Sequence, residues 1–165
     1  MAITAVVQRK IRIFLGLPAL TKLWIIPVWV LLGISKFMIF NIEFRRFAPM
    51  FGKRSALAPW VPLLTPKQEQ RALLIGRMVR MTAKYTPWDS NCFPQAIVAR
   101  LLLGLYGVPY VFYFGLQRKP DNPGKTNAHA WVVAGRVNVT GGMSFRQFTV
   151  VGCYRSPLLA EAGAL

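Results

Sequence analysis

Apolar and polar positions in the second half of the chain predict two consecutive helices. In the segment 67–85, apolar residues recur near helical spacing, at Leu73, Leu74, Met78, Val79 and Met81. Thr65 is a good cap residue, with Pro66 in the first helical position and Gln68 three residues after the cap. The first of these helices is therefore expected to begin at Pro66.

The second helix has a start that the sequence defines closely. Three residues that favour the N-cap position, Asp89, Ser90 and Asn91, are followed by Pro94, which a helix tolerates only in its first turn. The helix is thus expected to begin within a residue or two of Cys92, to continue through Leu105 and to end at Gly107.

Strand-like patterns follow the second helix. The aromatic-rich segment 110–116 predicts a buried strand, and the polar, turn-rich segment 117–127 predicts a loop. Apolar stretches separated by glycine turns then predict three antiparallel strands, HAWVVA (129–134), VNVT (137–140) and QFTVVGCY (147–154). Helices followed by such a sheet predict an α+β fold.

The first part of the chain differs from the rest, which suggests a division into residues 1–64 and 65–165. Residues 1–64 look helical and contain nine Lys and Arg against Glu43 alone. The segment 44–66 carries four prolines and is expected to be a broken connector. The N-terminus shows no long apolar core with a small-residue cleavage site, so no secretory signal is expected.

The apolar segment 22–41 is expected to form a buried or interfacial helix. Between Lys22 and Lys36 lie 13 uncharged residues, fewer than the roughly 20 that span a bilayer. Pro27 within the segment also argues against a span. The sequence leaves open whether this helix packs on the protein's own core, on a partner or on a membrane.

Composition restricts the possible partners. The chain has 165 residues, enough for one domain with a core, and 21 Lys and Arg against 5 Asp and Glu give a net charge of +16. Such a charge favours polyanions, acidic proteins or peripheral contact with an anionic membrane. The basic residues are scattered with no run of five, which argues against nucleic-acid binding.

Cysteine and histidine are rare and suggest chemistry rather than cross-linking. Cys92 and Cys153 are too few for a disulfide scaffold, and no cysteine–histidine cluster predicts a metal site. A reducing, cytoplasmic setting is therefore expected. A cysteine at a helix N-terminus has its thiolate favoured by the free N–H groups and the helix dipole. His129, the only histidine, begins a predicted strand and could accept the thiol proton.

Structural roles remain as alternatives. Buried free cysteines are common in protein cores, and a single histidine beside Trp131 can be a satisfied core side chain. Cys153 lies within an apolar strand and is expected in the core.

Several stretches of the chain together carry a resemblance to a known family. CFPQAIVARLLLGLYGVPYVFYFGL, AHAWVVAGRV, VTGG and FTVV occur in this order between residues 92 and 151. They resemble the transglutaminase-like leader peptidases of lasso-peptide biosynthesis, the B-type proteins. In that family a Cys-Leu/Phe-x-x-Ala helix start precedes a Gly-Ile/Val-Pro turn and an Ala-His-Ala-Trp strand. The resemblance covers about residues 60–153, and the basic N-terminal region matches the standalone protease form.

The resemblance implies a fold, an activity and partners. The fold would be a papain/transglutaminase-like domain with its nucleophile at a helix N-terminus against an antiparallel sheet. The activity would be that of a bacterial cysteine protease, without cofactor, that removes the leader from a ribosomal precursor peptide. A separate winged-helix leader-recognition protein and an ATP-dependent macrocyclase would act with it. An acyl-transfer enzyme on the same scaffold, and a non-catalytic, membrane-associated basic protein, are the alternatives.

The third catalytic residue departs from the family pattern. Family members usually carry an Asp about a dozen positions after the His, where this chain has Gly141. Asn138 and Thr140 share one face of the next strand, so Asn138 is expected to orient His129, with Thr140 behind it. Asp89 is a further candidate, although capping is its simpler role.

Residues near the nucleophile complete the predicted site. Asn91 and Gln95 could donate to an oxyanion, with capping or surface roles as the alternative. Trp88 and Trp131 could form walls of the substrate cleft, with core packing as the alternative.

Overall fold

The computed structural model describes residues 8, 12, 15–55, 61–119, 122–142 and 144–161. Its centre is a five-stranded antiparallel sheet in the order β1-β5-β2-β3-β4. The strands are β1 (Lys53–Arg54), β2 (Val111–Lys119), β3 (Asn122–Ala134), β4 (Val137–Thr140) and β5 (Thr149–Arg155). The helices are α2 (Ala19–Asn41), α3 (Phe44–Phe47), η1 (Ala48–Phe51), α4 (Pro66–Ala83), α5 (Cys92–Leu105), η2 (Ser144–Gln147) and α6 (Pro157–Glu161).

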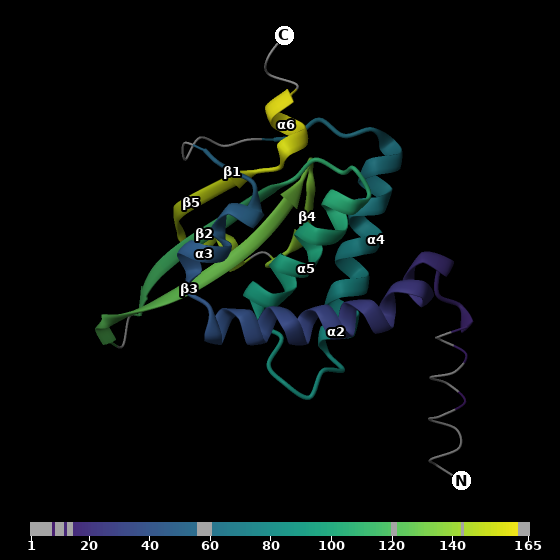
Figure 1. The fold of residues 1–165 in the computed structure, drawn as a ribbon, viewed down its shortest axis with the longest axis horizontal. Coiled ribbons are helices and arrows are strands. Elements are labelled where there is room, and N and C mark those ends of the chain that lie inside the picture. Colours follow the sequence, from purple (N-terminus) through teal and green to yellow (C-terminus); the bar gives the residue numbers. More distant parts are fainter. Residues whose placement is uncertain are drawn as a thin grey trace.

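Helices α4 and α5 pack on the sheet, and α2 runs across both of them as an outer layer (Figure 1). Both inner helices begin as predicted, because the signals for a helix start are local in the sequence. Thr65 and Gln68 form a capping box at the start of α4. Helix α5 begins at Cys92, and Gly107, with φ of 63°, follows its C-terminal end.

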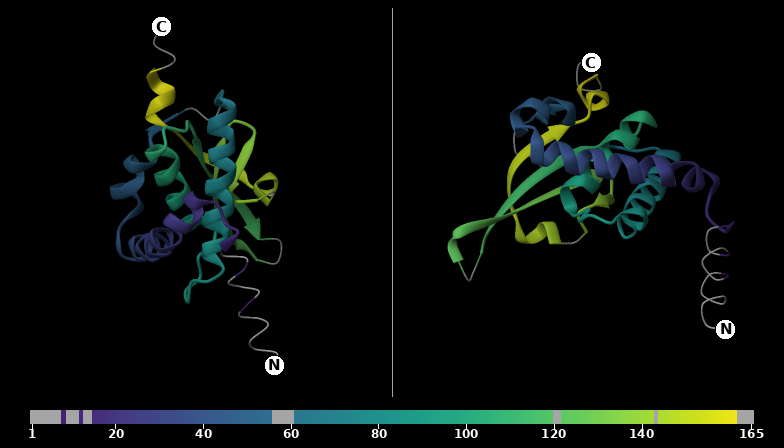
Figure 2. Two further views of the ribbon diagram at one scale, coloured as in Figure 1. Left: turned by 90° about the vertical axis from the view of Figure 1, so that its right-hand side faces the viewer. Right: turned by 60° about the horizontal axis from the view of Figure 1, so that its bottom comes forward.

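The longest hairpin is more regular than the sequence suggests. Strands β2 and β3 pair from Val111↔Val133 to Lys119↔Asn122, so the predicted loop over 117–127 is wrong. Backbone hydrogen bonds hold an antiparallel ladder together, and polar side chains can extend it into solvent on both faces. The end of this hairpin projects away from the helices (Figure 1 and the right-hand view of Figure 2).

The first 64 residues contribute to the same structure, as far as they are described. Strand β1 pairs with β5 through Lys53↔Arg155 and Arg54↔Tyr154. Helix α2 confirms a helix over 22–41 and extends it to 23 residues. Most of residues 1–14 lie outside the described part of the chain.

Aromatic rings fill the space between the helices and the sheet. The ring of Phe51 stacks on Phe112 at 4.5 Å between centroids, and both side chains are fully buried. Tyr110 is also buried, donates to the carbonyl of Phe51 and accepts from Arg100. Burial raises the pKa of Tyr110, and the nearby Arg100 opposes that rise. This core fixes α5, and with it Cys92, relative to the sheet.

Candidate active site

Cys92 and His129 line one cavity, which has a volume of about 370 Å³. Cys92 is the first residue of α5, and His129 lies on β3 opposite Gly115 of β2. The remaining lining is largely apolar and comes from α2, α3, α5 and the sheet: Ile39, Phe40, Phe44, Phe93, Pro94, Phe114, Ala128 and Ala130, with Lys36 and Asn91. The cysteine and the histidine that the sequence singled out thus both line this cavity.

The start of α5 supplies backbone N–H groups at Cys92. Asn91 occupies the N-cap position without a side-chain capping hydrogen bond. The first N–H groups of the helix, those of Cys92 and Phe93, therefore have no side-chain acceptor from their own cap. They can stabilise a thiolate, and after attack on a carbonyl they can donate to the oxyanion.

A backbone carbonyl orients the imidazole of His129. The Nε2 atom lies 3.0 Å from the carbonyl oxygen of Gly141. Since a carbonyl can only accept, Nε2 carries the proton and donates. In the neutral ring Nδ1 is then the basic nitrogen. The ring also stacks on Phe148 at 4.8 Å and on Trp131 at 5.7 Å between centroids, which restricts its rotation.

Gly141 is required at this point for a steric reason. Its φ is 91°, a region that disfavours side chains, and an added Cβ would lie 2.3 Å from the Cβ of Trp131. The same Cβ would come within 3.2 Å of Nε2 of His129. The close approach of the backbone therefore excludes a side chain and brings a main-chain oxygen to the imidazole instead.

The sequence of this chain matches one known protein family. A model described as the transglutaminase-like superfamily matches residues 38–153, more than two thirds of the chain. This chain belongs to the transglutaminase-like superfamily. The superfamily generally contains enzymes with a Cys-His(-Asp) set. No curated protein and no solved structure matches the chain.

The predicted orienter of this transglutaminase-like domain, Asn138, lies on β4 opposite Val133. Its role toward His129 stays a prediction, whereas the structure shows the hydrogen bond that His129 donates to the carbonyl of Gly141. Thr140 is 1% exposed, and its hydroxyl is buried without a hydrogen-bond partner among the described residues. Asp89 is exposed three residues before Cys92 and does not line the cavity.

Of the residues expected around the nucleophile, one lines the cavity and the others make structural contacts. Asn91 lines the cavity. The side-chain amide of Gln95 donates to the carbonyl of Ser90 at 2.6 Å, which is the capping alternative. Trp88 packs on Trp29 of α2 at 4.7 Å, and Trp131 is buried beneath His129. Neither tryptophan lines the cavity, where phenylalanines form the walls instead.

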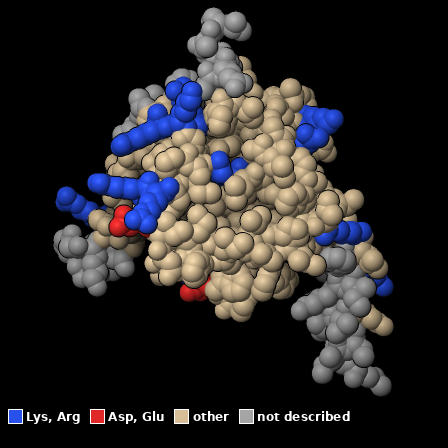
Figure 3. All heavy atoms as spheres, in the orientation of Figure 1, with Lys and Arg blue, Asp and Glu red and all other residues tan. Residues whose placement is uncertain are grey.

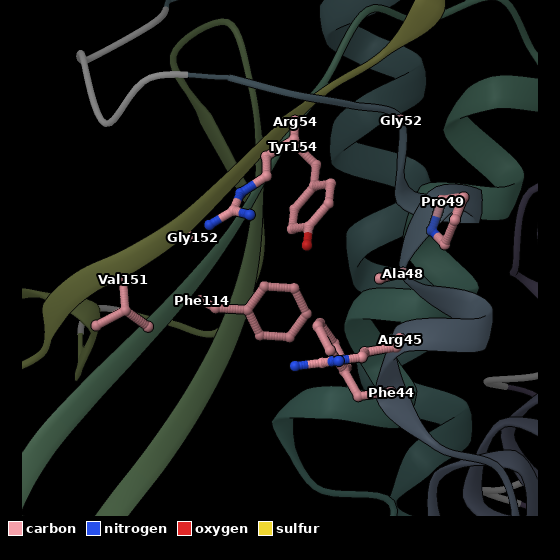
Figure 4. A pocket seen from close by; sticks show the side chains of 10 residues that line it. All are labelled: Phe44, Arg45, Ala48, Pro49, Gly52, Arg54, Phe114, Val151, Gly152 and Tyr154. Carbon is pink, nitrogen blue, oxygen red and sulfur yellow. The ribbon is translucent and has the colours of Figure 1, made fainter.

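A second cavity, of about 610 Å³, lies beside the first and shares Phe44 and Phe114 with it. Figure 4 shows Arg45 and Arg54 reaching into the space around the rings of Phe114 and Tyr154. No acidic side chain of the described residues lines this cavity. An apolar cleft beside Cys92 thus continues into a basic one.

The other cysteine of the domain lies outside the site. Cys153 is fully buried on β5, as predicted, and burial raises the pKa of its thiol while Arg155 partly opposes that rise. Among the described residues, no group of three or more His, Cys, Asp or Glu is placed to hold a metal ion.

Proposed function

We propose that this protein is a cysteine peptidase that removes the leader from a ribosomally made lasso-peptide precursor. The observation that carries the proposal is that Cys92 and His129 line one cavity, with Nε2 of His129 held by a carbonyl. That hydrogen bond leaves Nδ1 without the proton, as a base requires, and the proposal has Nδ1 act on the thiol at the N-terminus of α5. The resemblance of segments 92–116 and 128–137 to lasso-peptide leader peptidases supports the substrate class.

The reaction follows from these positions. The sulfur of Cys92 attacks the carbonyl carbon at the leader–core junction, and Nδ1 of His129 takes the thiol proton. The N–H groups of Cys92 and Phe93 donate to the oxyanion. When the tetrahedral intermediate collapses, the C–N bond breaks and the imidazolium gives its proton to the leaving amine. Water, deprotonated by His129, then cleaves the thioester, which releases the leader carboxylate and restores the thiol.

The cavity walls suggest how a peptide lies in the site. Phe40, Phe44 and Phe114 form an apolar surface that suits a nonpolar side chain next to the scissile bond. Arg45 and Arg54, in the adjoining cavity, suit an acidic residue of the same peptide. This part of the proposal predicts that peptide binding weakens as salt is added, because exposed charge pairs are screened.

The expected partners follow from the resemblance and the charge. We propose that a separate, winged-helix leader-recognition protein presents the precursor and that an ATP-dependent macrocyclase takes the product. The net charge of +16 would favour an acidic leader or an acidic recognition protein. Two free cysteines are consistent with a reducing, cytoplasmic compartment.

The test is mass spectrometry of the precursor peptide after incubation with this protein and its recognition partner. Wild type should cleave one bond, and Cys92→Ala and His129→Ala should each lose cleavage. Cys153→Ala is the matched control, because it removes the other thiol, outside the cavity, and should cleave as wild type does. A product joined to an added amine would indicate acyl transfer instead. Cleavage by Cys92→Ala would contradict the proposed nucleophile.

A further inference from the structure

Helix α2 presents an apolar outer face to solvent. Six residues, spaced three or four apart along the helix, are between 44% and 74% exposed: Leu23, Ile26, Val30, Ile34, Phe37 and Phe40. We call these six residues the outer face of α2. Soluble monomers rarely expose a continuous apolar patch along a whole helix, so this surface needs an occupant.

The opposite face holds α2 on the protein. Thr21, Val28, Leu32 and Ser35 are buried toward α4 and α5. The indole N–H of Trp24 donates to the hydroxyl of Tyr106 at 2.6 Å, and that of Trp29 donates to the carbonyl of Tyr85 at 3.3 Å. By length and composition α2 could cross a bilayer. Doing so would expose Val28 and Leu32 of the core and break both hydrogen bonds, so the packed position favours an occupant that covers only the outer face.

Positive charges lie within α2 and just after it. Lys22 and Lys36 lie within α2, and Arg45 and Arg46 follow its C-terminal end, with Glu43 as the nearest acid in sequence. In Figure 3 the surface over α2, in the lower part of the view, is mainly uncharged, and Lys and Arg gather mostly toward the left and right edges. A second copy of this chain would bring two charges of +16 together. An anionic surface complements this arrangement far better than another copy does.

We propose that the outer face of α2 binds the surface of an anionic lipid bilayer, with the helix lying in the plane of the interface. An apolar face bordered by lysines and arginines is the pattern of helices that lie at the boundary between head groups and acyl chains. Apolar side chains enter the acyl region, and the bordering cations contact acidic head groups.

The proposal places the candidate active site beside the membrane. Lys36 and Phe40 of α2 also line the cavity that holds Cys92 and His129. If the proposed function holds, the bound enzyme would meet its peptide at the lipid surface. Membrane binding itself does not depend on that function.

The experiment is flotation of the full chain with two kinds of vesicle. One contains phosphatidylcholine alone, and the other contains equal parts of phosphatidylcholine and phosphatidylserine. Wild type should float with the acidic vesicles, less so as salt is added, and much less with phosphatidylcholine alone. The double variant Ile26→Glu, Ile34→Glu should lose at least about tenfold in the bound fraction, since it places two charges where acyl chains would lie.

The matched control is Leu63→Glu with Leu105→Glu. These leucines are 94% and 65% exposed but lie outside α2, so this variant should float as wild type does. Circular dichroism of both variants checks that the fold is kept.

Three outcomes would overturn the proposal. Equal flotation by the α2 double variant and wild type would exclude the outer face as the binding surface. Equal binding to neutral vesicles would exclude recognition of acidic lipid. Wild type could instead fail to float and bind a protein, either a second copy of itself or the leader-recognition protein. If the α2 double variant lost that binding, the outer face of α2 would be assigned to a protein. Peptide cleavage measured without vesicles reports separately on the proposed function.

Discussion

Helices α5 and α2 are both apolar along their length, yet they lie in opposite environments. Helix α5 lies between the sheet, α4 and α2, and half of its 14 residues are buried. Helix α2 is longer, at 23 residues, and buries only four. Within the described part of the chain, α5 has neighbours on several sides, whereas α2 packs against α4 and α5 on one side.

This contrast separates two roles that composition alone cannot distinguish. An apolar helix covered on several sides fixes the position of what it carries, in this case Cys92 at its first residue. An apolar helix covered on one side keeps a surface for something outside the folded chain.

The largest effect is expected from placing one charge in each helix. Val98→Asp puts a carboxylate where the side chain is fully buried, and Ile34→Asp puts one where the side chain is 50% exposed. An unpaired buried charge should cost several kcal/mol and prevent folding, whereas the exposed one should change the free energy of unfolding by about 0.5 kcal/mol or less. Urea unfolding measures both. A large loss in Ile34→Asp would show that the outer face of α2 is covered in the folded protein.

Local chemistry explains which parts of the fold the sequence predicts well. The starts of α4 and α5 depend on neighbours in the chain, Thr65 with Gln68 and Asn91 before Cys92, so a short segment contains all the information. The length of the β2–β3 hairpin depends on pairing between backbones, to which polar side chains give no clue. The loop expected over 117–127 was wrong for that reason.

Of the candidate site, Cys92, His129 and Asn91 were predictable from the sequence. Cys92 and His129 carry distinctive side chains, but the partner of His129 is the carbonyl of Gly141. Every residue has a carbonyl, so no side-chain pattern can identify the one that faces an imidazole. The cavity walls are also hidden in the sequence, because Phe40, Phe44 and Phe114 come from three separate elements.

Two adjacent glycines test the role of the carbonyl in the covered region. Gly141→Ala should displace the loop, because its Cβ would clash with Trp131, and should shift His129 from its orientation. Misplacement of a catalytic group by about 1 Å can cost about 100-fold in rate, so kcat should fall by that order in the peptide-cleavage assay.

Gly142→Ala is the control for backbone strain. Gly142 also has a positive φ, of 58°, but an added Cβ meets nothing within 4 Å. It should lose about 1 kcal/mol of stability and keep its activity. Equal losses of activity in the two variants would refute a specific role for Gly141.

The boundary between the two regions is tested by two phenylalanines. Phe44 is 41% exposed and lines both cavities, whereas Phe37 is 65% exposed on the outer face of α2 and lines neither. Removing an apolar contact with the peptide should cost about 1–2 kcal/mol. Phe44→Ala should therefore raise KM by roughly tenfold with kcat little changed, and Phe37→Ala should leave both values unaltered in the absence of membranes. A fall in kcat alone for Phe44→Ala would mean that this ring supports the reacting groups rather than the peptide.

The smallest effect concerns the pH dependence of stability in the covered region. Burial raises the pKa of Cys153 above its ordinary value of 9.0, so the folded protein holds this proton more tightly than the unfolded chain does. The resulting stabilisation is complete below the ordinary pKa and is lost as pH rises through the raised one. One proton gives the free energy of unfolding a slope of at most about 1.4 kcal/mol per pH unit.

Urea unfolding of wild type and Cys153→Ala across alkaline pH measures this slope. The free energy of unfolding should decline less steeply with pH in the variant, while buried Tyr110 contributes in the same direction in both proteins. Parallel declines would mean that the thiol of Cys153 ionises as easily in the folded protein as in the unfolded chain, and that β5 leaves it open to water.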